Sequence, residues 1–110
     1  MTSSADAMNT AYRTLAHRAW DTNRARAAEL AALVSAWGRA GVLAAEQRER
    51  GRSIAHSLRG SAGTFGHEAA ADAAEELEEL LIGDAQPQLD LVADLVAQID
   101  FALTEPPDLS

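Results

Sequence analysis

The chain has 110 residues, the size of a single domain, and is 47% hydrophobic but only 5% aromatic, so its core must consist mainly of Ala, Leu and Val. The absence of cysteine excludes disulfides, cysteine nucleophiles and thiolate metal sites, and a formal net charge of −8 disfavours nucleic acid as a partner. No segment resembles a signal peptide or is apolar enough to span a membrane, so we expect a cytoplasmic protein that does not bind membranes.

A long helical pattern occupies the first third of the chain. Residues 1–10 are small and polar and are expected to be loose, whereas from about Ala11 apolar residues recur at helical spacing until Gly38 and Gly41. Asp21 begins a polar stretch and could cap a new helix, so the pattern allows either one long helix or two nearly collinear ones. The residues expected in the core are Tyr12, Leu15, Ala19, Trp20, Leu30, Val34 and Trp37.

Three further helices are predicted over about residues 42–64, 67–82 and 87–104, with residues 105–110 as a second loose tail. Gly66 and Gly83 suit the ends of the first two of these helices. The pattern predicts an all-α, antiparallel, up-down four-helix bundle, with an additional N-terminal helix or an N-terminal extension of the first long helix. No linker divides the chain, so residues 1–110 form one domain. The glutamates expected on a solvated acidic face are Glu75, Glu76, Glu78 and Glu79.

The helix expected over residues 42–64 has one histidine on the face that its apolar residues leave exposed. At about 100° per residue, Gly60 and Gly63 fall on the same face as His56, and Arg59 lies about 60° away. Glycine inside a helix is unfavourable by about 1 kcal/mol relative to alanine, so two of them beside His56 indicate the close approach of another molecule. The apolar stripe on the opposite face consists of Ile54, Leu58 and Phe65.

The motifs that the chain lacks disfavour metal and nucleotide chemistry. A di-metal site in a helical bundle needs Glu-x-x-His pairs, and the chain contains neither such a pair nor His-Glu-x-x-His. The run Gly-Ser-Ala-Gly at residues 60–63 lacks the Lys-Ser/Thr ending of a phosphate-binding loop, and no strand precedes it. We therefore expect no metal and no cofactor.

The candidate for chemistry is His56. An exposed imidazole is largely neutral near pH 7 and offers a nitrogen nucleophile that can accept a phosphoryl group. Arg59 would offset the added negative charge, and Gly60 and Gly63 would let the donor approach. The residues alone leave open that His56 is a solvent-facing histidine without a chemical role. They also leave open that the local arginines (Arg48, Arg50, Arg52 and Arg59) only form salt bridges with Glu46 and Glu49.

Residues 56–66, His-Ser-Leu-Arg-Gly-Ser-Ala-Gly-Thr-Phe-Gly, resemble the signature of the histidine-containing phosphotransfer (Hpt) domains. That signature is commonly His-x-Leu-Lys-Gly-Ser, with a further glycine after four or five more residues and a Leu-Glu pair farther along. Gly66 fits the later glycine, and Leu77 and Glu78 fit the pair. Arg59 stands where lysine is usual. This change keeps the positive charge but replaces the compact ammonium group of lysine with a planar guanidinium.

The resemblance implies a four-helix bundle in which His56 is the phosphorylated residue of a multistep phosphorelay. His56 would take a phosphoryl group from an aspartate of a response-regulator receiver domain and pass it to another receiver, with a hybrid sensor kinase as a further candidate partner. The resemblance also implies a phosphocarrier that is not an enzyme, binds no ATP and relies on the Mg²⁺ of the receiver domain. The main alternative is a non-phosphorylated docking or inhibitory bundle that binds receiver or kinase domains; a metal-binding bundle and a nucleic-acid-binding patch are more distant. His17 and His67 are assigned no catalytic role.

Overall fold

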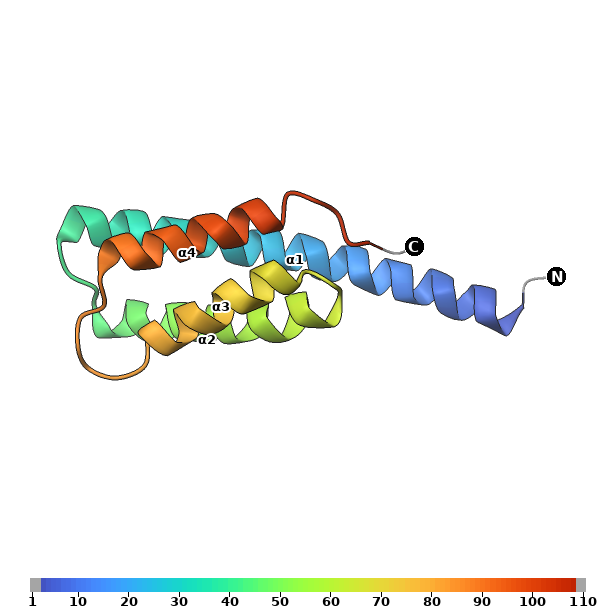
Figure 1. The fold of residues 1–110 in the computed structure, drawn as a ribbon, viewed down its shortest axis with the longest axis horizontal. Coiled ribbons are helices and arrows are strands. Elements are labelled where there is room, and N and C mark those ends of the chain that lie inside the picture. Colours follow the sequence, from blue (N-terminus) through green and yellow to red (C-terminus); the bar gives the residue numbers. More distant parts are fainter. Residues whose placement is uncertain (1–2, 109–110) are drawn as a thin grey trace.

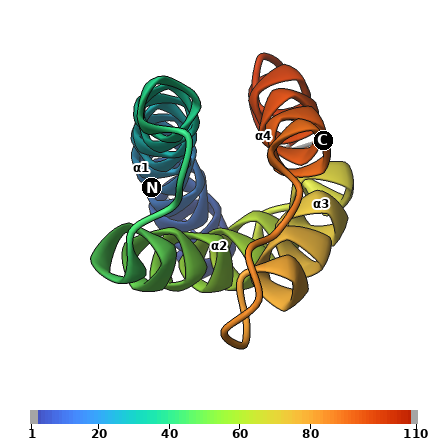
Figure 2. The same cartoon turned by 90° about the vertical axis from the view of Figure 1, so that its left-hand side faces the viewer.

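A computed structural model describes residues 3–108, which form four α-helices and, over that range, no β-strand. The helices are α1 (Ser4–Ala40), α2 (Ala45–Thr64), α3 (Glu68–Leu80) and α4 (Leu89–Ala102). Consecutive helices run in opposite directions, and α4 packs back against α1 (Figures 1 and 2). The end-on view of Figure 2 places α1 and α4 on one side of the bundle and α2 and α3 on the other. The predicted all-α, antiparallel four-helix bundle is confirmed.

The first helix is continuous, which decides between the two arrangements that the sequence allowed. It spans 37 residues, or about 55 Å, and Asp21 lies inside it rather than capping a second helix. It begins at Ser4, where the Ser3 hydroxyl accepts a hydrogen bond from the Asp6 N–H at 3.1 Å. Residues 4–10, where the sequence predicted a loose segment, are helical, and residues 1–2 lie outside the described range. The helix ends at Gly41, which has a φ of 78°.

The start of α1 extends past the other helices as an overhang of residues 4–15 (Figure 1). Every residue of this overhang is exposed, including Tyr12 and Leu15, which were expected in the core. The apolar spacing of α1 continues into the overhang, but no helix lies beside most of it. The Tyr12 ring packs against Phe65, with 5.8 Å between the ring centroids. The expectation that Tyr12 and Leu15 belong to the core is wrong for this reason.

The core consists mainly of alanine, leucine and valine side chains from all four helices. Trp37 is buried among them, whereas Trp20 is only partly buried at the edge of the core, where its indole N–H donates to the Leu103 carbonyl at 2.7 Å. Gly51 lets α2 approach closely, since a Cβ at this position would lie 3.1 Å from Leu81 Cδ1. The small residues therefore set the spacing between the helices.

One polar residue of α1 is buried between α1 and α2. Asn23 is 1% exposed, its amide nitrogen donates to the Ser61 hydroxyl at 3.1 Å, and its amide oxygen accepts from Arg26 at 2.8 Å. Satisfied at both ends, this side chain is a stable part of the interface rather than a break in the helix.

Side chains tie together the two loops at one end of the bundle. The Gln86 amide makes two hydrogen bonds of 3.1 Å with the backbone of Leu43, and Arg48 donates to the carbonyls of Gly83 and Ala85. These contacts account for the helix bounds: α2 begins at Ala45 rather than at 42 or 43, and α4 begins at Leu89 rather than at Pro87. In both loops, backbone groups just before the next helix form these hydrogen bonds with side chains instead of helical ones.

The C-terminal segment packs against the bundle instead of being loose. Pro107 is buried, and His67 Nε2 lies 2.9 Å from the Glu105 carbonyl. The expectation of a loose tail is therefore wrong for residues 105–108, and residues 109–110 lie outside the described range.

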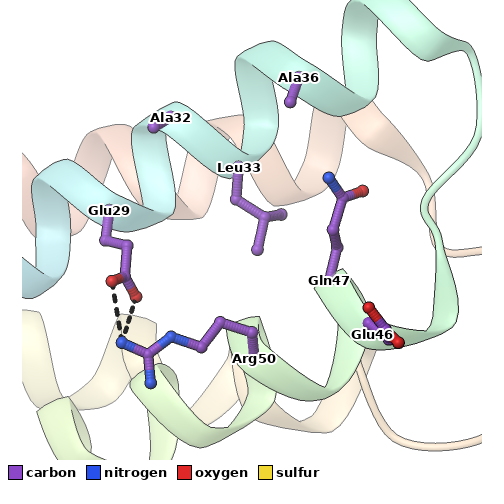
Figure 3. Close-up of a pocket in the computed structure, with 7 residues that line it drawn as sticks. All are labelled: Glu29, Ala32, Leu33, Ala36, Glu46, Gln47 and Arg50. Atoms are coloured by element: carbon purple, nitrogen blue, oxygen red, sulfur yellow. Dashed lines mark hydrogen bonds and ion pairs between the residues drawn. The ribbon is translucent and has the colours of Figure 1, made fainter.

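A shallow groove of about 370 Å³ runs between α1 and α2 near their loop (Figure 3). Its apolar floor includes Ala32 and Leu33, and an ion pair of 2.8 Å between Arg50 and Glu29 closes one end. The groove lacks His56 among its lining residues, so it is separate from the site described next.

Candidate functional site

His56 projects from the middle of α2 with 66% of its side chain exposed. On the opposite face, Ile54 and Leu58 are buried in the core at 4% and 0% exposure. The helical periodicity of α2 therefore places His56 where the sequence predicted, on the water-facing side of the helix.

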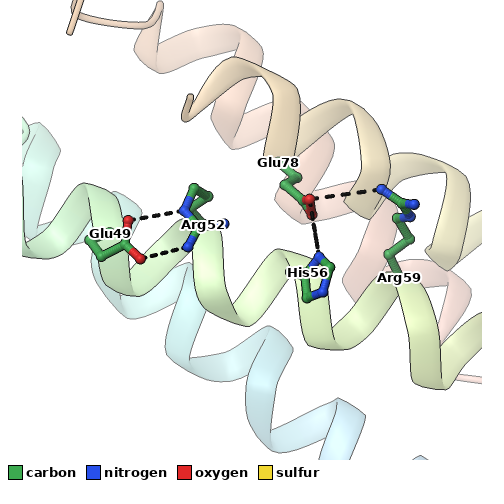
Figure 4. Close-up of polar contacts among 5 residues, drawn as sticks. All are labelled: Glu49, Arg52, His56, Arg59 and Glu78. Carbon is green, nitrogen blue, oxygen red and sulfur yellow. Dashed lines mark hydrogen bonds and ion pairs between the residues drawn. The ribbon is translucent and has the colours of Figure 1, made fainter. Parts of the chain in front are cut away.

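Glu78 of α3 lies against the imidazole (Figure 4). The Nδ1 atom of His56 is 3.1 Å from Oε1 and 3.0 Å from Oε2 of Glu78, whose side chain is only 11% exposed. The prediction that Glu78 belongs to a solvated acidic face is wrong. Glu78 follows Ala74 by one turn and Leu77 directly, so it lies at the edge of the buried stripe of α3 and faces α2.

The contact with Glu78 fixes how the imidazole presents its two nitrogens. A carboxylate only accepts hydrogen bonds, so the nitrogen that faces it, Nδ1, bears the proton of the neutral ring. The lone pair is then on Nε2, at the opposite edge of the exposed ring. The contact with Glu78 thus orients the His56 ring so that Nε2 faces away from Glu78.

Arg59 lies one turn after His56 and turns toward the same carboxylate (Figure 4). Its Nη1 atom is 3.8 Å from Glu78 Oε1, and 48% of its side chain is exposed. With 3.8 Å between the charged groups and the guanidinium half exposed to water, this ion pair is weak, so the guanidinium can leave Glu78 for a stronger anion near His56.

The other arginines of α2 have partners of their own. Arg52 binds Glu49 through two hydrogen bonds, of 2.9 and 2.6 Å, Arg50 pairs with Glu29 of α1, and Arg48 serves the loop cross-link. The expected pairing with Glu49 is present, whereas none of the ion pairs described within residues 3–108 involves Glu46.

At Gly60 and Gly63 no side chain covers the backbone of α2 beside His56. A Cβ at Gly60 would have no atom within 4 Å, so the backbone there is bare and open to solvent. A Cβ at Gly63 would lie 3.6 Å from Ala71 Cβ, an ordinary contact on the side of α3. At Gly60 the surface beside His56 is thus bare backbone rather than side chain.

Residues 3–108 were searched for a metal-binding cluster and for a membrane-spanning helix. No group of three or more His, Cys, Asp or Glu residues in residues 3–108 is arranged to hold a metal ion, and no helix there is both long and apolar enough to cross a bilayer. His17 packs edge-on against Trp20, and His67 contacts the C-terminal segment. Neither lies with His56.

Sequence reasoning singled out His56, Arg59, Gly60 and Gly63 as candidate site residues, and the structure brings all four onto one stretch of α2. It did not find the contact of Glu78 with His56, because pairing across two helices leaves no periodic signal within either helix. The available signal was the Leu77-Glu78 match to the Hpt signature, which marks the position without stating its contact.

The family profile described as the Hpt domain matches residues 15–105, which cover the bundle and leave out most of the overhang. No curated protein and no solved structure shows significant similarity to the chain. Because the match spans most of the sequence and all four helices, the chain belongs to the Hpt domain family.

Proposed function

We propose that His56 is the phosphorylated residue of a multistep phosphorelay, accepting a phosphoryl group from a receiver-domain aspartate and passing it to another receiver. Membership of the Hpt family supports histidine phosphotransfer in general. The observation that supports His56 in particular is its exposed ring, whose Nδ1 contacts Glu78 at 3.0 Å and whose Nε2 is thereby free.

In the proposed step, Nε2 attacks the phosphorus atom of the aspartyl phosphate. The N–P bond forms as the P–O bond to the aspartate breaks, and the aspartate leaves as a carboxylate. The ring then has both nitrogens substituted and bears a positive charge, which Glu78 stabilises through the Nδ1–H bond. The reverse sequence returns the phosphoryl group to a second aspartate.

The neighbours of His56 have supporting roles in this proposal. Arg59, at 3.8 Å from Glu78, is near enough to exchange that weak contact for the phosphoryl oxygens. Gly60 and Gly63 allow the receiver surface to approach the backbone of α2. The protein acts as a phosphocarrier in the cytoplasm, without kinase activity of its own, and its partners are receiver domains, with a hybrid sensor kinase as a further candidate.

The test is transfer of labelled phosphate from a phosphorylated receiver domain to the purified protein. Wild type and the matched control His17→Gln, which alters a histidine on α1, should be labelled, and His56→Gln should not. The label should be lost in acid, because phosphohistidine is acid-labile. Equal, acid-stable labelling of His56→Gln would contradict the proposal. A receiver that binds the protein and responds equally to wild type and His56→Ala would instead support the docking alternative.

A further inference from the structure

A second groove lies between α3 and α4. Its apolar lining consists of Leu80 from α3 and of Leu91 and Leu95 from α4. Its volume is about 280 Å³, just below the range of roughly 300–1,000 Å³ that is usual for pockets that enclose a small molecule. The groove therefore suits the side chains of another protein better than a free small molecule.

Helix geometry separates this groove from the site at His56. Glu76 and Leu80 lie two residues before and after Glu78, so they point about 160° away from it around the axis of α3. Because Glu78 faces His56 on α2, Glu76 and Leu80 face α4. Figure 2 shows the same arrangement, with α3 between α2 and α4. An occupant of the groove and a partner at His56 thus meet different faces of α3.

The groove exposes leucine side chains at helical spacing. Leu91 and Leu95 are one turn apart on α4, and Leu91 is 44% exposed although Leu95 beside it belongs to the core. Leu80 is partly buried against the same core. An apolar strip of this kind between two helices matches the apolar face of a third helix, whose side chains meet it at spacings of three and four residues.

The charges beside the groove are all negative. Glu76 and Glu79 line it, and α3 and α4 contain no lysine or arginine, because all 9 basic residues of the chain lie before residue 60. Of the acidic residues on these two helices, Glu78 alone takes part in an ion pair within residues 3–108. Like charges on adjacent turns of a helix repel one another, and a cationic partner relieves that repulsion.

We propose that the groove between α3 and α4 binds a basic amphipathic helix of a partner protein. The apolar face of that helix packs on Leu80, Leu91 and Leu95. Its lysine or arginine side chains lie beside Glu76 and Glu79. Charge disfavours a second copy of this chain as the occupant, since each copy has a net charge of −8, and the same argument disfavours an anionic membrane surface.

The test is a titration of the ¹⁵N-labelled full chain with a synthetic peptide of about 18 residues, which has leucines at spacings of three and four residues and lysines between them. We expect the largest changes in amide chemical shift around Leu80 and Leu91, and an affinity that falls as the salt concentration is raised. A peptide of the same composition, with its leucines scattered around the helix, should bind about tenfold more weakly because it has no apolar face.

Variants of the protein separate the apolar contribution from the charged one. Leu91→Gln, at an exposed position, should weaken binding of the amphipathic peptide by about tenfold, because it removes an apolar contact. Glu76→Gln/Glu79→Gln should weaken binding by about threefold to tenfold. The matched control Asp100→Asn/Glu105→Gln removes the same charge outside the groove, near the other end of α4, and should weaken binding by less than about twofold.

The proposal is overturned if the amphipathic peptide does not bind or binds no better than the scattered one. It is also overturned by unchanged binding in Leu91→Gln, or by equal losses in the charge variant and its matched control, because the acidic surface as a whole would then attract the peptide. Shift changes centred on the face of α2 that bears His56 would contradict it too. The titration involves no phosphate, so a failure of phosphotransfer at His56 would leave this result standing.

Discussion

Replacing Gly60 by alanine should stabilise the protein and slow phosphotransfer at the same time. Gly60 lies inside α2, where alanine is favoured over glycine by about 0.8–1 kcal/mol, and the added Cβ has no atom within 4 Å. We therefore expect the free energy of unfolding to rise by nearly 1 kcal/mol. For a domain of this size that corresponds to a rise of roughly 5 °C in Tm.

The same methyl group stands where the receiver is proposed to meet bare backbone. An extra methyl group in a close-packed contact costs about 1–3 kcal/mol, so kcat/KM for transfer from a phosphorylated receiver should fall by roughly fivefold to 150-fold. Thermal melts followed by circular dichroism and single-turnover transfer assays give the two quantities on the same preparation.

Gly51→Ala is the matched control in the same helix. Its Cβ would lie 3.1 Å from Leu81 Cδ1 and 3.3 Å from Leu33 Cδ1, so the gain in helix propensity is offset by crowding and no stabilisation is expected. Because Gly51 is buried away from the His56 face, transfer per folded molecule should stay at the wild-type rate. A Gly60→Ala protein that is more stable yet transfers as fast as wild type would refute the role of Gly60 in close approach.

Three further predictions concern stability and the imidazole. Glu78→Gln removes the charge that stabilises the phosphorylated ring, so transfer should slow by about tenfold, the equivalent of about 1.4 kcal/mol in a charge-assisted hydrogen bond; an unchanged single-turnover rate would contradict this. Asn23→Ala deletes two hydrogen bonds in a buried position and should lower the free energy of unfolding in urea by about 2 kcal/mol; a loss below about 0.5 kcal/mol would show that the network is dispensable. Deletion of residues 1–10 removes only exposed side chains among those described, so the Tm should stay within about 3 °C of wild type, and a larger fall would reveal support from the overhang.

The sequence predicted the elements that depend on local periodicity. Four segments with apolar residues at helical spacing predicted the bundle. The spacing around His56 predicted that it lies on the exposed face, because helix geometry fixes the angle between residues of one helix. Arg59 and Gly60 followed from the same geometry. These features need no knowledge of which helix lies next to which.

The features that the sequence did not predict depend on contacts between helices. Glu78 borders the apolar stripe of α3, unlike the exposed Glu79, but its contact with His56 depends on how α2 lies against α3. Tyr12 and Leu15 continue the apolar pattern of α1 but extend beyond α2, so periodicity alone assigned them to a core that ends before them. The start of α1 at Ser4 was missed because the Ser3 cap outweighs a polar composition.

The overhang of α1 affects the equilibrium between helix and coil at the start of this helix. A short isolated helix is unstable in water because its first turn must be nucleated at a high cost in entropy. Here the bundle supplies that nucleus, and the turns before Tyr12 only propagate it, each residue adding one hydrogen bond at nearly zero net free energy. The end of the helix therefore shifts with temperature, and amide protection against hydrogen exchange should decline smoothly from Tyr12 toward Ser4 rather than in one step. The folded domain thus carries on its end a helix–coil equilibrium of the kind otherwise studied in peptides.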